Sequence, residues 1–243
     1  MIELLASMTV MLIGIFAVYA VFQAGIVQIR RASLITTAAA IADSEMEKYR
    51  AIKYDSIGLA DSAVIAADST YKGDTAYRAD TSPTTTLAGS GITSGSQLTI
   101  PVASAAGFPT TSPYIVKIDS EYILVSGGAG TTTWTVYQAA DRGLFGTTAT
   151  THSAGATVTQ IQRVNVAACG TAPCTTAVPT KTVTGADGRS YRVDTYVTWK
   201  QIGNSGTTTG RLGKLVTVAV RASTSPYRRW ARVSSLFDAS TGQ

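Results

Sequence analysis

Histidine, cysteine and charged residues are all scarce in this chain of 243 residues. It has one histidine, His152, and two cysteines, and only 14% of its residues are charged. His152 is the one histidine that a Ser–His–Asp or Cys–His arrangement could use, and we expect no such arrangement. Asp119 and Glu121 are a candidate acid–base pair, but they lie between two apolar runs, where we expect a solvated turn. The sequence therefore predicts no enzyme activity, no metal site and no cofactor.

The two cysteines, Cys169 and Cys174, lie close together in the sequence ACGTAPC. They lack the second pair of ligands that a zinc site needs. In an exported protein a local disulfide is the expected alternative. Closing so short a loop contributes only about 2 kcal/mol in the chain-entropy model, so the bond would pin a turn rather than hold a domain together.

Charge is missing altogether from a long apolar segment at the N-terminus. Glu3 and Arg30 flank residues 4–29, and none of these 26 residues is charged. At about 1.5 Å per residue a helix of this length covers roughly 39 Å, more than the roughly 30 Å hydrocarbon core of a bilayer. A cleaved secretory signal normally starts with a basic residue and has a shorter apolar core. A plain membrane anchor explains the length but not Glu3, because charge in or near hydrocarbon is costly and tends to mark a function.

The helical pattern continues beyond this segment. Apolar residues recur at steps of three and four, as on one face of an amphipathic helix: Leu34, Ala38, Ile41, Ala42, Met46, Tyr49 and Ile52. We expect the helix to end near Ile57, with Gly58 as its C-terminal stop. The first half of such a rod needs lipid or other copies of itself, whereas the second half can pack on the β-structure of its own chain.

The stretch IELLASMTVMLIGI resembles the start of bacterial type IV pilins and type II secretion pseudopilins, where an IELL or VELL motif leads into an apolar helix. The resemblance implies a precursor in the inner (cytoplasmic) membrane, whose leader a prepilin peptidase removes and whose new N-terminus is methylated. It implies that the pilus assembly machinery then moves the subunit into an extracellular filament, or fimbrium, which is a helical homopolymer. It also implies that Glu3 complements the N-terminal amine of a neighbouring subunit.

Two features depart from that family. The acid lies two positions further along in the family, so the resemblance predicts two further N-terminal residues or a different processing site. Arg30 and Arg31 would place the β-structure in the cytoplasm by the positive-inside rule. We expect the opposite, pilin-like orientation because of Glu3.

Two glycines interrupt the apolar segment. Gly14 and Gly25 are compatible with close approach of another helix. By resemblance to the family, we also expect a non-helical stretch within residues 12–26 in the filament.

The remainder of the chain predicts antiparallel β-structure, so the expected fold class is α+β. Residues 58–95 are expected to be a connecting loop region. In residues 96–160 short apolar runs alternate with Gly, Pro and Ser, which is typical of a small antiparallel unit. Residues 161–243 carry the longer runs YRVDTYVTW, KLVTVAV and RWARVSSLF, which predict an antiparallel meander.

Two further resemblances concern these blocks. Within residues 96–160, an E-aliphatic-aliphatic-V strand, TWTV and then GTTA…H..GA.V resemble a β module of many phage tail and fibre proteins. That match implies a surface module without an activity, and it gives His152 a turn or packing role. The last block resembles the sheet of minor-pilin-like proteins, so we interpret residues 96–160 as an insertion between the pilin helix and its sheet.

Positive charge is concentrated in the last third of the chain. The formal balance is 0 over residues 1–57, −3 over 58–160 and +8 over 161–243. Oppositely charged patches can meet between neighbouring subunits, or can simply be solvated. The stretch PYRRWARV combines cations with aromatic rings, which is a combination that binds single-stranded nucleic acid or acidic glycans. The candidate residues are Tyr227, Arg228, Arg229, Trp230 and Arg232, with a strand-edge or subunit contact as the alternative.

These patterns predict a structural subunit of a type IV pilus that polymerises with itself through its N-terminal helix. A minor pilin or pseudopilin at low copy number, with an adhesive or DNA-binding role, is the first alternative. A membrane-anchored surface protein that never polymerises is the second.

Overall fold

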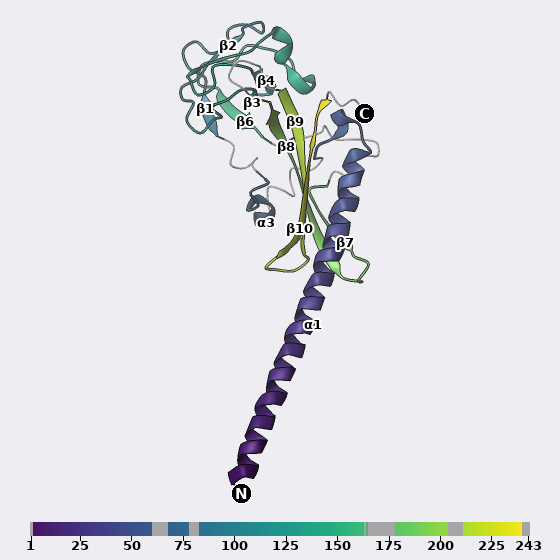
Figure 1. Cartoon of the computed structure of the whole chain (residues 1–243). Helices are drawn as coiled ribbons and strands as arrows, with labels where there is room; N and C mark the ends of the chain where they lie inside the picture. The colour runs from purple at the N-terminus through teal and green to yellow at the C-terminus, as the bar shows by residue number, and fades with distance from the viewer. Residues whose placement is uncertain are drawn as a thin grey trace.

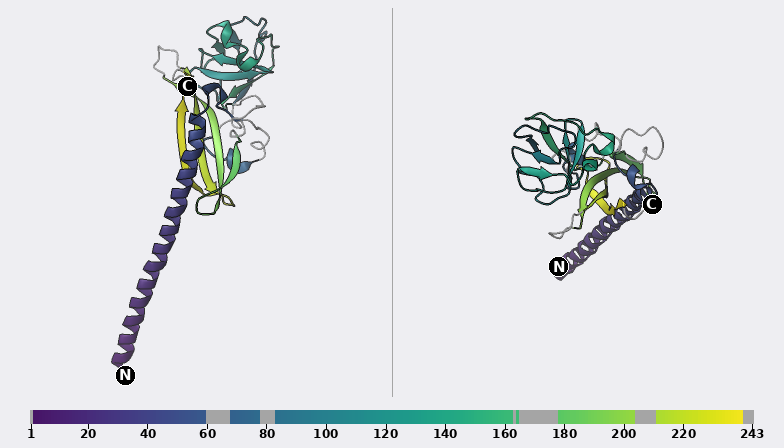
Figure 2. Two further views of the ribbon diagram at one scale, coloured as in Figure 1. Left: turned by 90° about the vertical axis from the view of Figure 1, so that its right-hand side faces the viewer. Right: turned by 90° about the horizontal axis from the view of Figure 1, so that it is seen from above.

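A computed structural model of the chain describes residues 2–59, 68–77, 83–162, 164, 178–203 and 211–239. These residues form a long N-terminal helix, a four-stranded sheet against its C-terminal half, and a small β module at the far end of that sheet (Figure 1). The fold class is α+β, as expected. Two further views show the N-terminal half of the helix projecting away from everything else (Figure 2).

Helix α1 (Ile2–Arg50) is continuous, and its two halves have different surroundings. The large apolar side chains that the structure describes between Ile2 and Ile29 are exposed, whereas one stripe of the C-terminal half is buried against the sheet. The buried stripe consists of Ala38, Ala42, Met46 and Tyr49. These positions recur at steps of four and three, so the predicted packing face is confirmed.

Helix α1 ends at Arg50, seven residues before the expected end at Ile57. After it, Lys53 is extended and Tyr54–Ser56 form a single 3₁₀ turn, η1. The cause lies in the sheet, where Lys214 donates from Nζ to the carbonyl oxygens of Tyr54 at 2.8 Å and Ile57 at 2.9 Å. A side chain distant in sequence thus binds carbonyl groups of the turn that follows the helix, and Ile57 turns into the core.

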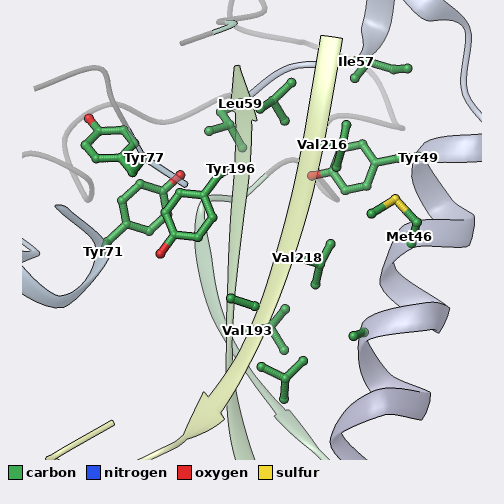
Figure 3. Close-up of a cluster of buried hydrophobic side chains, with 14 of the residues drawn as sticks. Met46, Tyr49, Ile57, Leu59, Tyr71, Tyr77, Val193, Tyr196, Val216 and Val218 are labelled. Atoms are coloured by element: carbon green, nitrogen blue, oxygen red, sulfur yellow. The ribbon is translucent and has the colours of Figure 1, made fainter. Parts of the chain in front are cut away.

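The sheet against α1 has the strand order β10-β9-β8-β7, with every neighbouring pair antiparallel. Its strands are β7 (Thr180–Thr184), β8 (Ser190–Ile202), β9 (Arg211–Ala222) and β10 (Arg229–Phe237). Because this order follows the chain, the predicted meander is confirmed. Val193, Val216 and Val218 pack toward Met46 and Tyr49 of the helix (Figure 3). We call this sheet, with the helix half and residues 57–59 and 68–77 packed on it, the sheet domain.

The opposite face of this sheet is also covered. The short helix α3 (Ser69–Lys72) and the turn after it place Tyr71 and Tyr77 beside Tyr196 of β8 (Figure 3). The ring centroids of Tyr71 and Tyr196 lie 4.4 Å apart. Both faces of β8 are therefore buried, because a segment from before the β module folds over the second face.

The β module has a core of its own around Trp134, whose ring centroid lies 4.8 Å from that of Phe108. One sheet has the order β1-β6-β3-β4, and a separate pair joins β2 to β5. The strands are β1 (Thr84–Thr86), β2 (Thr99–Pro101), β3 (Tyr114–Ile118), β4 (Glu121–Val125), β5 (Thr133–Thr135) and β6 (Thr157–Ile161), with 3₁₀ turns η3 (Ala139–Asp141) and η4 (Leu144–Gly146). Strands β2 to β6 fall in the short apolar runs of the predicted antiparallel unit.

The module begins earlier than predicted. Strand β1 lies in the expected connecting region 58–95, yet it pairs with β6, with Thr84 opposite Thr159, and Leu87 belongs to the module core. The chain therefore enters and leaves the module on adjacent strands, and Gln160 N donates to Pro83 O at 3.1 Å. This is the geometry that an insertion requires. The local sequence could not predict this boundary, because the short segment TTT forms a strand only through its pairing with β6, more than 70 residues further along the chain.

The module contacts the sheet domain through a few side chains. The ring of Phe145 stacks on Trp199 of β8, with centroids 5.6 Å apart and planes at 22°. Gln201 accepts a hydrogen bond from Thr111 Oγ1 at 3.1 Å and donates one to the carbonyl oxygen of Ser112. These contacts dock the module against one end of the sheet.

Candidate assembly helix and charged clusters

Glu3 lies in the first turn of α1 and is exposed. A carboxylate in this position complements the positive end of the helix dipole. Figure 1 shows this end as the tip of the helix, far from the sheet domain and the β module. Neither the sheet domain nor the β module can therefore supply a cationic partner for Glu3.

The surface around the N-terminal half of α1 is apolar on every side. Large hydrophobic side chains from Ile2 to Ile29 are between 45% and 82% exposed. The helix is long and apolar enough to cross a membrane, and none of its most apolar segment is buried within the chain. Soluble monomers rarely expose apolar patches larger than a few hundred Å². This surface therefore needs lipid or other protein against it.

Polar side chains interrupt this surface at a few places. Ser7 donates to the carbonyl oxygen of Leu4 at 3.0 Å, which satisfies its hydroxyl within the helix. Gln23 Nε2 donates to the hydroxyl oxygen of Tyr19 at 2.9 Å, which joins two polar side chains one turn apart. A shallow apolar groove runs along a neighbouring face, over Ala17, Val21 and Gly25.

The predicted basic–aromatic patch is divided in the structure. The guanidinium of Arg228 lies 5.1 Å from the ring centroid of Trp230, near the start of β10. Arg229 and Arg232 instead approach Asp74, at 3.8 Å and 4.0 Å. The fifth residue, Tyr227, lies under the guanidinium of Arg192, at 4.9 Å. Within this patch, only Arg228 and Trp230 therefore pair as a cation and an aromatic ring, with Arg228 exposed and Trp230 half-buried against the sheet-domain core. The other three residues contact a cluster of ion pairs.

That cluster centres on Asp194, which is fully buried in β8. Its carboxylate accepts hydrogen bonds from Arg192 Nε and Arg221 Nε, both at 2.8 Å. Arg192 continues to Asp68 at 2.6 Å, and Arg221 contacts Asp74. Burial raises the pKa of Asp194, and the two arginines act in the opposite direction. The cluster ties the segment around α3 to β8 and β9, and sequence reasoning missed it.

A second charged cluster lies in the β module and corrects an expectation. Asp119 is exposed as predicted, but Glu121 is fully buried rather than solvated. Arg142 binds both oxygens of Glu121, through Nε at 2.8 Å and Nη2 at 2.7 Å. His152 places Nδ1 2.7 Å from Asp119 Oδ2 and Nε2 2.7 Å from Glu121 Oε2. Glu121 is buried because Arg142 and His152 approach it from loops 21 and 31 residues away.

The ion pairs and hydrogen bonds of this second cluster join loops of the β module. Burial disfavours the charge on Glu121, but its bonds to Arg142 and His152 hold the pKa of that carboxyl below its usual value. Arg142 also donates to the carbonyl oxygens of Ser94 and Gln97, at 3.0 Å and 3.1 Å. His152 is buried, as its expected packing role requires. The charges of Glu121 are thus taken up within the module.

The remaining site predictions concern the cysteines and metal ions. Cys169 and Cys174 lie outside the residues that the structure describes, so their disulfide stays a prediction. Within the described ranges, no group of three or more His, Cys, Asp or Glu side chains is arranged to hold a metal ion.

Comparison of the chain with protein-family models, curated proteins and solved structures finds no match. The functional interpretation therefore rests on the residue pattern and the geometry of this chain.

Proposed function

We propose that this chain is a structural subunit of a type IV pilus-like filament, held in the cytoplasmic membrane before it polymerises outside the cell. The observation that carries the proposal is a single helix with two different halves. The C-terminal half of α1 packs on the sheet domain, whereas the N-terminal half is apolar, exposed on every side and begins with Glu3. A bilayer and a bundle of like helices are the two environments that such a surface needs in succession.

The energetics require that such a transfer keep the apolar segment out of water. Burying one large apolar side chain is worth about 1.5–3 kcal/mol, so exposing the whole segment to water would cost tens of kcal/mol. Moving it from lipid into a helix bundle keeps it out of water, and packing then decides the balance. A charged N-terminal amine in that dry bundle needs a counter-charge, and Glu3 of a neighbour supplies one.

Replacing Glu3 tests this proposal. We expect Glu3→Ala to leave the membrane-held subunit at its normal level but to abolish filaments, measured by immunoblotting of membranes and electron microscopy of sheared surface material. Glu47→Ala is the matched control, because Glu47 is an exposed glutamate of the same helix, near its C-terminal end, where it pairs with Arg50. Normal filaments from Glu3→Ala would refute the role of this carboxylate.

A minor pilin or pseudopilin with an adhesive or DNA-binding role is the second candidate. The exposed Arg228 over the Trp230 ring favours it, because cations and aromatic rings together hold nucleic acid or acidic glycans. Mass spectrometry of sheared filaments distinguishes the two candidates. A major subunit accounts for most of the filament mass, whereas a minor one is present at low copy number.

A further inference from the structure

The pair formed by Tyr19 and Gln23 is a polar feature within the uncharged apolar half of α1. Gln23 Nε2 donates to the Tyr19 hydroxyl oxygen at 2.9 Å, and both side chains are on the exposed surface of the helix. On a rise of about 1.5 Å per residue, Gln23 lies about 10 Å and Tyr19 about 4 Å from the midpoint of residues 4–29. Both therefore fall within the half-thickness of a hydrocarbon core, about 15 Å.

The direction of the bond keeps these groups in the apolar layer. A glutamine near the end of a membrane helix can extend its amide toward the interface, which here is marked by Arg30. Gln23 instead reaches back along the helix to Tyr19, toward the middle of the segment. The pair is therefore placed to meet another protein at this depth rather than the lipid headgroups.

The bond uses only part of the hydrogen-bonding capacity of the pair. A glutamine amide carries two N–H donors and a carbonyl acceptor, and a tyrosine hydroxyl both donates and accepts. One amide N–H and one phenol lone pair are used between Gln23 and Tyr19. Lipid tails offer no partner for the rest, whereas a second copy inserted in the same orientation brings the same donors and acceptors to nearly the same depth.

The residues around the pair have the spacing of a helix–helix seam. Leu12, Phe16, Ile26 and Arg30 share the face of Tyr19 and Gln23, at alternating steps of four and three. This spacing is that of a parallel two-helix seam, in which a single polar position sets the register. The first fully buried contact of α1 with the sheet domain is Ala38, about 22 Å further along the helix, so the sheet domain leaves this level open.

We propose that Tyr19 and Gln23 join two membrane-held copies of this chain into a parallel helix pair before any filament forms. The amide and phenol groups of one copy bond to those of the other, and the flanking apolar residues pack beside them. The inference rests on the membrane-held stage of the proposed function, but not on polymerisation itself.

Energy transfer between donor- and acceptor-labelled full-length chains in phosphatidylcholine vesicles tests this pairing. We expect Gln23→Leu to raise the protein-to-lipid ratio for half-maximal association about three- to tenfold, which lies within the range measured for hydrogen bonds between membrane helices. Tyr19→Phe should act in the same direction. Gln28→Leu is the matched control, because the same change is made about 140° around the helix, and it should shift association less than about twofold.

Several outcomes would overturn the pairing. These are a wild-type chain that stays monomeric at all ratios, or a Gln23→Leu variant that associates like Gln28→Leu or more tightly. Far-UV circular dichroism of each inserted variant verifies that the helix is retained. Paired chains that never give filaments would uphold this inference and refute the proposed function, whereas filaments grown from monomeric chains would do the reverse.

Discussion

At the level of single residues, a buried carboxylate holds the loops of the β module together. Glu121 binds Arg142 through two bonds and His152 through a third, and Arg142 extends the contacts to the carbonyl groups of Ser94 and Gln97. Removing the negative charge leaves a buried guanidinium without its counter-charge, which is more costly than losing the pair as a whole.

We expect Glu121→Gln to destabilise the module by about 3–5 kcal/mol. Asp119→Asn is the control, since it removes the exposed partner of the same histidine and should cost less than about 1 kcal/mol. Urea unfolding, followed through the fluorescence of buried Trp134, measures both. Equal effects of the two substitutions would show that burial of Glu121 is not what matters.

Lys214 gives the sheet domain a pH dependence of a defined sign. Burial lowers the pKa of this lysine to about 8, from an ordinary value of 10.5. Between these values the unfolded chain binds more protons than the folded chain, so the free energy of unfolding rises with pH. The charged lysine is penalised below pH 8, and that penalty is relieved as the pH increases.

Between pH 8 and pH 10 we therefore expect Lys214 to contribute a gain of about 2 kcal/mol in stability. Lys214→Met removes the titrating group and should remove this gain. Urea unfolding of both proteins across this range gives the difference directly. If the two curves run parallel, the lysine stays charged in the folded protein, held by the carbonyl groups around it.

At the level of elements, helix α1 shows how one continuous helix serves two environments. The spacing of apolar residues after Arg31 predicted the buried stripe, because periodicity is a local property that shows in the sequence. The end of the helix was mispredicted, because Lys214, which takes up the carbonyl groups of Tyr54 and Ile57, is about 160 residues away.

Two methionines of this helix make a matched comparison of its halves. Met46 is 1% exposed against the sheet, whereas Met11 is 66% exposed in the apolar half. We expect Met46→Ala to lower the stability of the sheet domain by about 2–4 kcal/mol, because it leaves a cavity beside Val216 and Val218. Met11→Ala should leave that stability unchanged. Urea unfolding in detergent, monitored through the near-UV signal, distinguishes them.

At the level of the whole molecule, the β module is attached through adjacent strands. Pro83 and Gln160 are hydrogen-bonded where the chain enters and leaves, and the module has a core separate from that of the sheet domain. Its contacts with the sheet domain are few, chiefly Phe145 on Trp199 and the bonds of Gln201. The two units therefore have the anatomy of separate domains.

We expect replacement of residues 84–161 by a short Gly–Ser linker to leave the helix and the β7–β10 sheet folded. The measurement is protease resistance and near-UV circular dichroism of the shortened chain, compared with the full-length protein. Loss of the folded sheet would show that the sheet domain depends on the module. Retention would also allow filament formation to be examined without the module.

The sequence by itself determined the elements whose signal is periodic: the apolar half of α1, its packing stripe, the strands within residues 96–160, and the meander. Such patterns predict structure because the regular geometry of a helix or strand sets which positions along the chain share a face. Only the tertiary structure decided where α1 ends, that β1 belongs to the module, and that Glu121 and the second face of β8 are buried. It also divided the predicted basic patch, drawing Arg229 and Arg232 toward Asp74. Each of these depends on a partner that approaches from a distant part of the chain, so no local pattern records it.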